Sequence, residues 1–247
     1  MKNCQLGPKF SVYLDLNFKI VGSELGWLVF YSLLYGVMGV VQLQVSDVKN
    51  LILYFSFGFL WVLIRCMPKL CKESMYDGQA MLFQSVPVTS FETVLAKMLI
   101  GCAAFMIPLL IYGIQFIAAV AWHEEIWDYF YSYFSEQGFD DAQMIAGAFI
   151  SVWIMGLIAF AVSGICLMAF AVGNHFRGRS NRWKKWVIML LAAAVQLAAA
   201  VGLLWLIWLV GVLPVLVRLL LIMAAAIVLS VVLVRLNVAV LETWYAI

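Results

Sequence analysis

The residues closest to a catalytic arrangement are His123, Glu124 and Glu125, because histidine and glutamate bind zinc and activate water in zinc proteases. A protease helix of that kind carries a second histidine one turn later, in the pattern His-Glu-x-x-His. Position 127 is instead Trp127. The other histidine, His175, lies beside a basic loop, where an interfacial position explains it better than catalysis does. The chain therefore offers no protease arrangement and no predicted metal site.

The cysteines and glycines supply no cofactor site either. Five cysteines are spread along the chain: Cys4, Cys66, Cys71, Cys102 and Cys166. Cys66 and Cys71 lack zinc-ligand spacing and have no histidine nearby, so we interpret the cysteines as reduced thiols that fill packing space. The phosphate-binding run Gly-x-x-x-x-Gly-Lys-Ser/Thr is absent. We therefore expect neither enzymatic activity nor a bound cofactor in this chain.

The composition is that of a protein surrounded by lipid. The chain is 66% hydrophobic and 11% charged, with a mean hydropathy of +1.03, whereas soluble domains are roughly 45–50% apolar and about 25% charged. The net charge of +2 is too small to indicate nucleic-acid binding. A helix that is apolar all round must face lipid or another helix, so the partner implied by composition is the bilayer.

The apolar runs predict an all-α, polytopic membrane protein, formed as a single transmembrane domain over residues 1–247. A run of about 20 apolar residues can cross the hydrocarbon layer. Six runs qualify: 24–43, 51–68, 94–121, 143–173, 187–211 and 215–237. Residues 1–23 are expected to be cytoplasmic or interfacial. Within them, residues 10–20 alternate apolar and polar side chains as a strand does, but a lone strand has no partner, so a segment lying in the interface is preferred.

The distribution of lysine and arginine predicts the orientation, because cytoplasmic loops carry the excess of these residues. One side of the predicted membrane has 12 of the 15 basic residues: Lys2, Lys9, Lys19, Arg65, Lys69, Lys72, Lys97, Arg177, Arg179, Arg182, Lys184 and Lys185. The first outer loop has only Lys49, and residues 122–142 have none. We expect a multi-pass plasma-membrane protein with both termini, the loop 69–93 and the basic loop 174–186 in the cytoplasm.

The loop between the second and third predicted spans, residues 69–97, has the clearest motif. Residues 73–83 can form a short amphipathic helix, and the chain before Pro87 is extended because a residue preceding proline avoids the helical region. Thr89 or Ser90 can cap the third span, with Glu92 or Thr93 in its first turn.

This loop resembles the one that follows the second span in permease subunits of ABC-2-type ATP-driven exporters. The family pattern has a glutamate, then a glycine, a leucine-leucine-x-serine-leucine-proline-valine-serine run, and a lysine at the start of the third span. The matching residues are Glu73, Gly78, Met81-Leu82-Phe83, Ser85-Val86-Pro87-Val88-Thr89-Ser90 and Lys97. The motif covers about 25 residues, whereas the six-span plan covers the whole chain. Gln79 and Val86 depart from the pattern and leave the substrate class open.

The resemblance implies a permease that pairs with a second permease copy or a related chain. It also implies two copies of an ATP-binding subunit, which would hold the ATP and Mg²⁺. Residues 73–84 would then form a coupling helix on that subunit, with its contacts at Glu73, Tyr76, Asp77, Gly78, Met81, Phe83, Ser85 and Pro87. The alternative is an ordinary interfacial helix lying on lipid. The implied activity is export by alternating access, and the apolar spans favour an amphiphilic or hydrophobic peptide as substrate.

The predicted outer loop, residues 122–142, is rich in acids and aromatic residues. Tryptophan and tyrosine gather at membrane interfaces, so an aromatic belt explains most of this composition. The sharper hypothesis is an acidic exit vestibule for a cationic amphiphile. Its residues would be Glu124, Glu125, Trp127, Asp128, Asp140 and Asp141.

Two other functions remain as alternatives. An ion-coupled secondary transporter commonly places ionisable residues in mid-membrane, but the centres of the predicted spans hold none. A non-transporting immunity or assembly protein would have the same helices. A purified complex with an ATP-binding protein would separate the exporter from both.

Overall fold

The structure is a computed structural model that describes residues 9–42, 57–73, 88–122, 128, 131–132, 135, 141–175, 187, 190–191, 193–194, 198, 201–202 and 215–244. No strand occurs among these residues, and the predicted all-α class is confirmed for them. The long helices are α1 (Phe10–Gln42), α4 (Ser90–Trp122), α6 (Asp141–His175) and α8 (Val215–Trp244). Two short π-helices, η2 (Val62–Cys66) and η3 (Lys69–Glu73), lie between α1 and α4 in the sequence.

Three helices in the described part of the chain are long and apolar enough to cross a membrane. They are Ser90–Gln115 within α4, Ala146–Gly173 within α6 and Leu216–Thr243 within α8. These stretches coincide with the third, fourth and sixth predicted spans. The first predicted span falls almost entirely within α1, whereas part of the second and most of the fifth lie outside the described residues. The chain thus has the character of a membrane protein.

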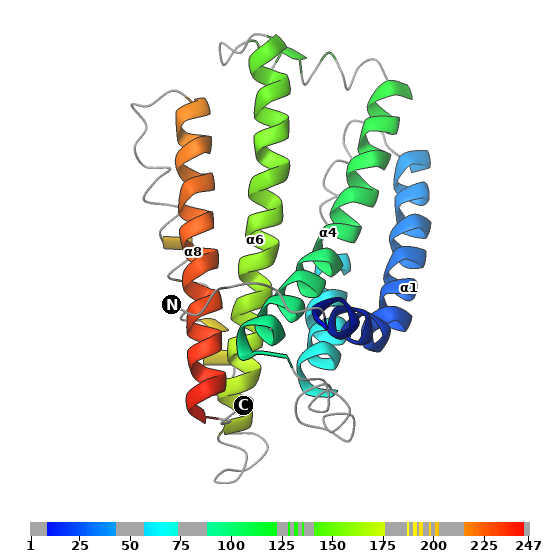
Figure 1. Cartoon of the computed structure of the whole chain (residues 1–247). Helices are drawn as coiled ribbons and strands as arrows, with labels where there is room; N and C mark the ends of the chain where they lie inside the picture. The colour runs from blue at the N-terminus through cyan, green and yellow to red at the C-terminus, as the bar shows by residue number, and fades with distance from the viewer. Residues whose placement is uncertain are drawn as a thin grey trace.

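The alternating segment 10–20 forms the first turns of α1 rather than a strand. A helix bonds its own backbone groups and needs no neighbouring strand. The buried residues Tyr13, Asn17 and Val21 follow one another at four-residue spacing, which is the repeat of a helix face. In Figure 1 this part of α1, drawn dark blue, lies across the bundle before the helix turns upward.

Helix α4 is the central helix, because it packs against α1, α6 and α8 (Figure 1). It begins with a capping box formed by Thr89 and Glu92. The Thr89 backbone N–H donates to Glu92 Oε2 at 2.8 Å, and the Glu92 N–H donates to Thr89 Oγ1 at 3.2 Å. The predicted cap is therefore confirmed, with Thr89 as the capping residue and Glu92 as its partner in the first turn.

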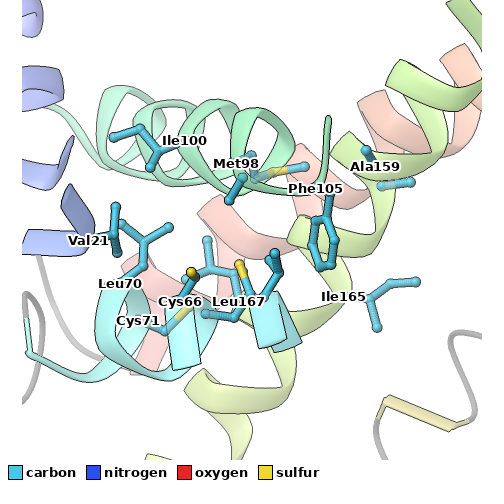
Figure 2. Close-up of a cluster of buried hydrophobic side chains, with 14 of the residues drawn as sticks. Val21, Cys66, Leu70, Cys71, Met98, Ile100, Phe105, Ala159, Ile165 and Leu167 are labelled. Atoms are coloured by element: carbon cyan, nitrogen blue, oxygen red, sulfur yellow. The ribbon is translucent and has the colours of Figure 1, made fainter. Parts of the chain in front are cut away.

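The buried core lies where α1, the π-helical segment, α4 and α6 meet. Figure 2 shows Val21, Leu70, Met98 and Leu167 directed into this region from those four elements. Figure 2 also labels Cys66, Cys71, Ile100, Phe105, Ala159 and Ile165 in the same cluster. The core therefore surrounds the beginning of the loop that the sequence singles out.

Two glycines permit a close crossing of α4 and α6. A Cβ atom added to Gly101 would lie 2.7 Å from Ser163 Oγ, and one added to Gly164 would lie 2.7 Å from Met98 Cε. Small residues of this kind let helix backbones approach in lipid, where packing contacts drive association.

The outer faces of the long helices are apolar. Side chains that are about half exposed or more include Leu110, Ile114, Ile117, Phe149, Trp153, Val228, Val231 and Leu236. Exposed apolar side chains of this kind on α4, α6 and α8 are suited to contact with lipid tails and poorly suited to water.

Candidate functional site

The structure describes only some of the residues that the sequence selects for function. Glu73 is the last residue of η3, Asp128 is helical and exposed, and Asp141 begins α6. The other predicted coupling residues lie outside the described residues: Tyr76, Asp77, Gly78, Met81, Phe83, Ser85 and Pro87. The same holds for the exit residues Glu124, Glu125, Trp127 and Asp140. What the structure describes is the chain at both ends of loop 74–87.

A buried lysine, Lys97, lies beside the chain that leads into residues 74–87. Lys97 stands about two turns into α4 and is 1% exposed. Its Nζ donates to Asn17 Oδ1 at 3.2 Å and to the Leu70 carbonyl at 2.9 Å. A buried amine is tolerated only where polar groups replace its water, and here these two oxygens do so. One side chain therefore joins α4 to α1 and to η3.

A second layer of polar contacts holds Asn17 in place. The Asn17 Nδ2 donates to the Tyr13 carbonyl at 2.8 Å. The Tyr13 side chain is hydrogen-bonded to Thr93 and Asn17, and burial raises the pKa of its phenol above the ordinary value of 10.0, with both hydrogen bonds opposing the rise. Tyr13 is therefore a neutral phenol at physiological pH. We call Tyr13, Asn17, Leu70, Thr93 and Lys97 the Lys97 cluster.

The π-helix η3 is held from its outer side as well. Lys69 Nζ donates to Ser23 Oγ at 3.1 Å and lies 3.5 Å from Glu24 Oε1. On the inner side, Cys71 is completely buried, and burial raises the pKa of its thiol to about 12 although the nearby Lys97 acts in the opposite direction. Cys71 is thus a packing thiol, as the sequence predicts, and η3 contacts α1 on one side and the core on the other.

Pro68 gives a reason for the π-helical winding on either side of it, in η2 and η3. Proline has no N–H, and its ring clashes with the carbonyl four residues earlier in an α-helix. A wider turn relieves both problems. Just before Pro68, the Met67 N–H bonds the Val62 carbonyl five residues back, which is the π-helical pattern.

Lys97, predicted from the sequence to be one of the basic side chains of a cytoplasmic loop, lies instead in the protein interior. The side chain is enclosed by protein, because α1 and η3 cover this face of α4. The signal in the sequence was its place in the apolar run 94–106, where a charge is unusual. Asn17 was missed as well, and its only signal is the four-residue spacing from Tyr13 and Val21.

The Lys97 cluster joins three elements by hydrogen bonds. Among the residues that the structure describes, no group of three histidine, cysteine or acidic side chains could hold a metal ion. Asn17 Oδ1 and the Leu70 carbonyl, which accept hydrogen bonds from Lys97, belong to segments that are distant in the sequence. Comparison of the chain with protein-family models, with curated proteins and with solved structures gives no match. The family resemblance therefore rests on the residues of the loop.

Proposed function

We propose that this chain is the membrane-spanning permease subunit of an ATP-driven exporter, which moves amphiphilic or hydrophobic peptides or similar amphiphiles out of the cell. In this proposal the chain crosses the plasma membrane six times, keeps both termini in the cytoplasm, and pairs with a second permease. Two ATP-binding subunits bind ATP and Mg²⁺ and hydrolyse the nucleotide. The observation that carries the proposal is the motif from Glu73 to Lys97, which lies between the second and third predicted spans.

The contacts at the two ends of loop 74–87 support this proposal. Before the loop, Leu70 is bonded to Lys97, and Lys69 contacts Ser23 and Glu24 of α1. After the loop, the Thr89 cap begins α4. A loop anchored at both ends to the same bundle passes a force to the bundle instead of absorbing it as free chain.

The proposed mechanism is alternating access. ATP-driven closure of the two cytoplasmic subunits would push residues 76–83, and the anchored ends of the loop would transfer this motion to α1 and α4. Rocking of the bundle would open it outward and release substrate near the acidic loop 122–142. The described residues supply the anchors, and the partner subunit would supply the energy.

The test is the ATPase activity of the chain co-purified with any ATP-binding protein that associates with it. Tyr76→Ala combined with Phe83→Ala removes the two largest apolar side chains of the proposed contact, so we expect loss of the complex or of substrate-stimulated ATP hydrolysis. The matched control is Phe149→Ala combined with Trp153→Ala. These residues are 67% and 69% exposed on α6 and lie outside both loop 74–87 and loop 122–142.

Equal loss of complex in the control would show that removal of aromatic residues anywhere disturbs the protein. Failure of any ATP-binding protein to co-purify, together with a normal Tyr76→Ala, Phe83→Ala variant, would contradict the exporter proposal. In that event loop 74–87 is an interfacial helix, and a non-transporting immunity or assembly protein becomes the better explanation.

One observation favours a second candidate, an ion-coupled transporter. Lys97 is an ionisable residue buried inside an apolar stretch, and such residues are functional candidates in membranes. Transport into proteoliposomes separates the two cases. Uptake driven by a proton or sodium gradient without ATP supports ion coupling, whereas uptake that requires ATP and the partner supports the exporter.

A further inference from the structure

The bond between Lys97 and Leu70 falls on the last π-helical turn before loop 74–87. Leu70 belongs to η3, whose final described residue is Glu73. The carbonyl of Leu70 would bond residue 74 in an α-helix and residue 75 in a π-helix. Lys97 Nζ donates to this same carbonyl at 2.9 Å from within the core. The lysine is therefore placed to influence how this turn is wound.

The winding decides which side chains of η3 face the core. In the observed π register, Leu70 and Cys71 are buried, while Lys69 points to Ser23 and Glu24. A slip of one residue would turn the following chain by about 100° and shift it by about 1.5 Å along the axis. That slip would change the direction in which the chain leaves Glu73. Lys69 is joined to Leu70 by one peptide bond, so loss of the Lys97 bond to the Leu70 carbonyl would also release Lys69 from its fixed place beside Glu24.

We propose that Lys97 is a positioning residue that holds η3 in its π register, and so sets the direction in which the chain enters loop 74–87. Asn17 assists by accepting the second hydrogen bond and fixing the lysine against α1. We call the hydrogen bond from Lys97 to the Leu70 carbonyl, with Asn17 as its support, the latch. The latch does not depend on the exporter assignment. Only its use in coupling the loop to ATP hydrolysis rests on the proposed function.

A zero-length carbodiimide crosslink reports whether η3 is held beside α1, and it needs no engineered residues. The reagent joins an amine to a neighbouring carboxylate, and Lys69 Nζ lies 3.5 Å from Glu24 Oε1 across two segments. Lys19 Nζ lies 2.7 Å from Asp15 Oδ2 within α1, so that pair is independent of the register of η3. Both crosslinks can be quantified by mass spectrometry of one sample in detergent or lipid nanodiscs.

Lys97→Met keeps the length of the side chain and removes its donor. We expect the Glu24–Lys69 crosslink to fall roughly tenfold, since two buried hydrogen bonds are lost, while the Asp15–Lys19 crosslink is unchanged. The control Lys19→Met removes an exposed lysine and should abolish only the Asp15–Lys19 crosslink. A wild-type yield of the Glu24–Lys69 crosslink in Lys97→Met overturns the proposal.

Wild-type protein supplies a second test if Lys97→Met does not fold. A water-soluble amine-acylating reagent should label Lys19 readily and leave Lys97 unlabelled until the protein is unfolded. Labelling of Lys97 at a rate similar to that of Lys19 would show that the lysine is not held in the core, and would also overturn the latch.

The complex with the ATP-binding protein separates this inference from the proposed function. There, Lys97→Met should transport several-fold less substrate for each ATP hydrolysed, an effect on the ratio that a merely structural lysine would not produce. If transport per ATP is unchanged, the latch has no role in coupling. If no ATP-binding protein associates with the chain, the exporter assignment fails while the crosslink still decides the latch.

Discussion

Asn17 and Lys97 are 80 positions apart in the sequence, yet Asn17 Oδ1 accepts a hydrogen bond from Lys97 Nζ at 3.2 Å in the interior of the bundle. Both side chains are almost completely buried. This contact fixes the first turns of α1 against α4. It also makes the stability of the bundle depend on a polar residue in a segment whose side-chain alternation resembles a strand.

Replacement of Asn17 by leucine should destabilise the protein. The change leaves one hydrogen bond of Lys97 unmade inside the core, so we expect the free energy of unfolding to fall by about 1–3 kcal/mol. Thermal unfolding in a mild detergent measures the effect. Ser11→Ala, at an exposed position of the same helix, should shift stability by less than about 0.5 kcal/mol. Equal melting temperatures for the two variants would contradict the importance of this contact.

Loss of the helix cap should weaken the start of α4. Thr89→Ala removes the hydroxyl that bonds the Glu92 N–H and carboxylate, and we expect a loss of about 1 kcal/mol. Thr243→Ala is the matched control, since that hydroxyl bonds the Ala239 carbonyl near the end of α8. Amide hydrogen exchange should rise in the first turn of α4 for Thr89→Ala alone. Unchanged exchange there would mean that the cap does not stabilise the turn.

Adding one methyl group to α4 should change stability differently at its crossing with α6 and on its exterior. Gly101→Ala would bring a Cβ to 2.7 Å from Ser163 Oγ, so we expect destabilisation of about 1–3 kcal/mol by overpacking. Gly113→Ala, in the same helix, adds a Cβ that meets no atom of the described residues within 4 Å. That change should be neutral or stabilise the helix by up to about 1 kcal/mol. Unfolding temperatures that do not separate the two variants would argue against the close approach of α4 and α6.

The thiol of Cys71 should stay protonated and unreactive. With a pKa of about 12, roughly one molecule in ten thousand carries the thiolate at pH 8. A maleimide should therefore label Ser11→Cys quickly and Cys71 only after unfolding, in a background where the other cysteines are serine. Labelling of Cys71 in folded protein as fast as at position 11 would contradict its burial.

The raised pKa of the Cys71 thiol also affects the stability of the protein at high pH. The folded state keeps a thiol proton that the unfolded chain releases above about pH 9, because burial raises the folded pKa. The contribution of Cys71 to stability is therefore complete below pH 9 and is lost progressively as the pH rises toward 12. Cys71→Ala should make the fall in unfolding temperature over that window less steep. An identical slope in both proteins would contradict the shift.

The sequence predicts those elements that a single physical effect decides. Long apolar runs predict helices that cross lipid, and α4, α6 and α8 coincide with three of them. The Thr89 to Glu92 spacing predicts the cap that begins α4, because a capping box depends only on residues close in the sequence. Residues 10–20 alternate as a strand does but were not expected to form one, since a lone strand has no partner; packing of Tyr13, Asn17 and Val21 against neighbouring helices favours the helix there.

The sequence by itself determined the membrane character, the helical class and the cap at which α4 begins, because hydropathy and capping act over short distances along the chain. Only the tertiary structure decided that Lys97 lies inside the bundle and not in a solvated loop. Its burial depends on Asn17 and Leu70, which come from distant segments and supply the oxygens that replace water. A favourable environment for a buried amine is a property of three elements packed together, so no window of sequence around Lys97 contains it.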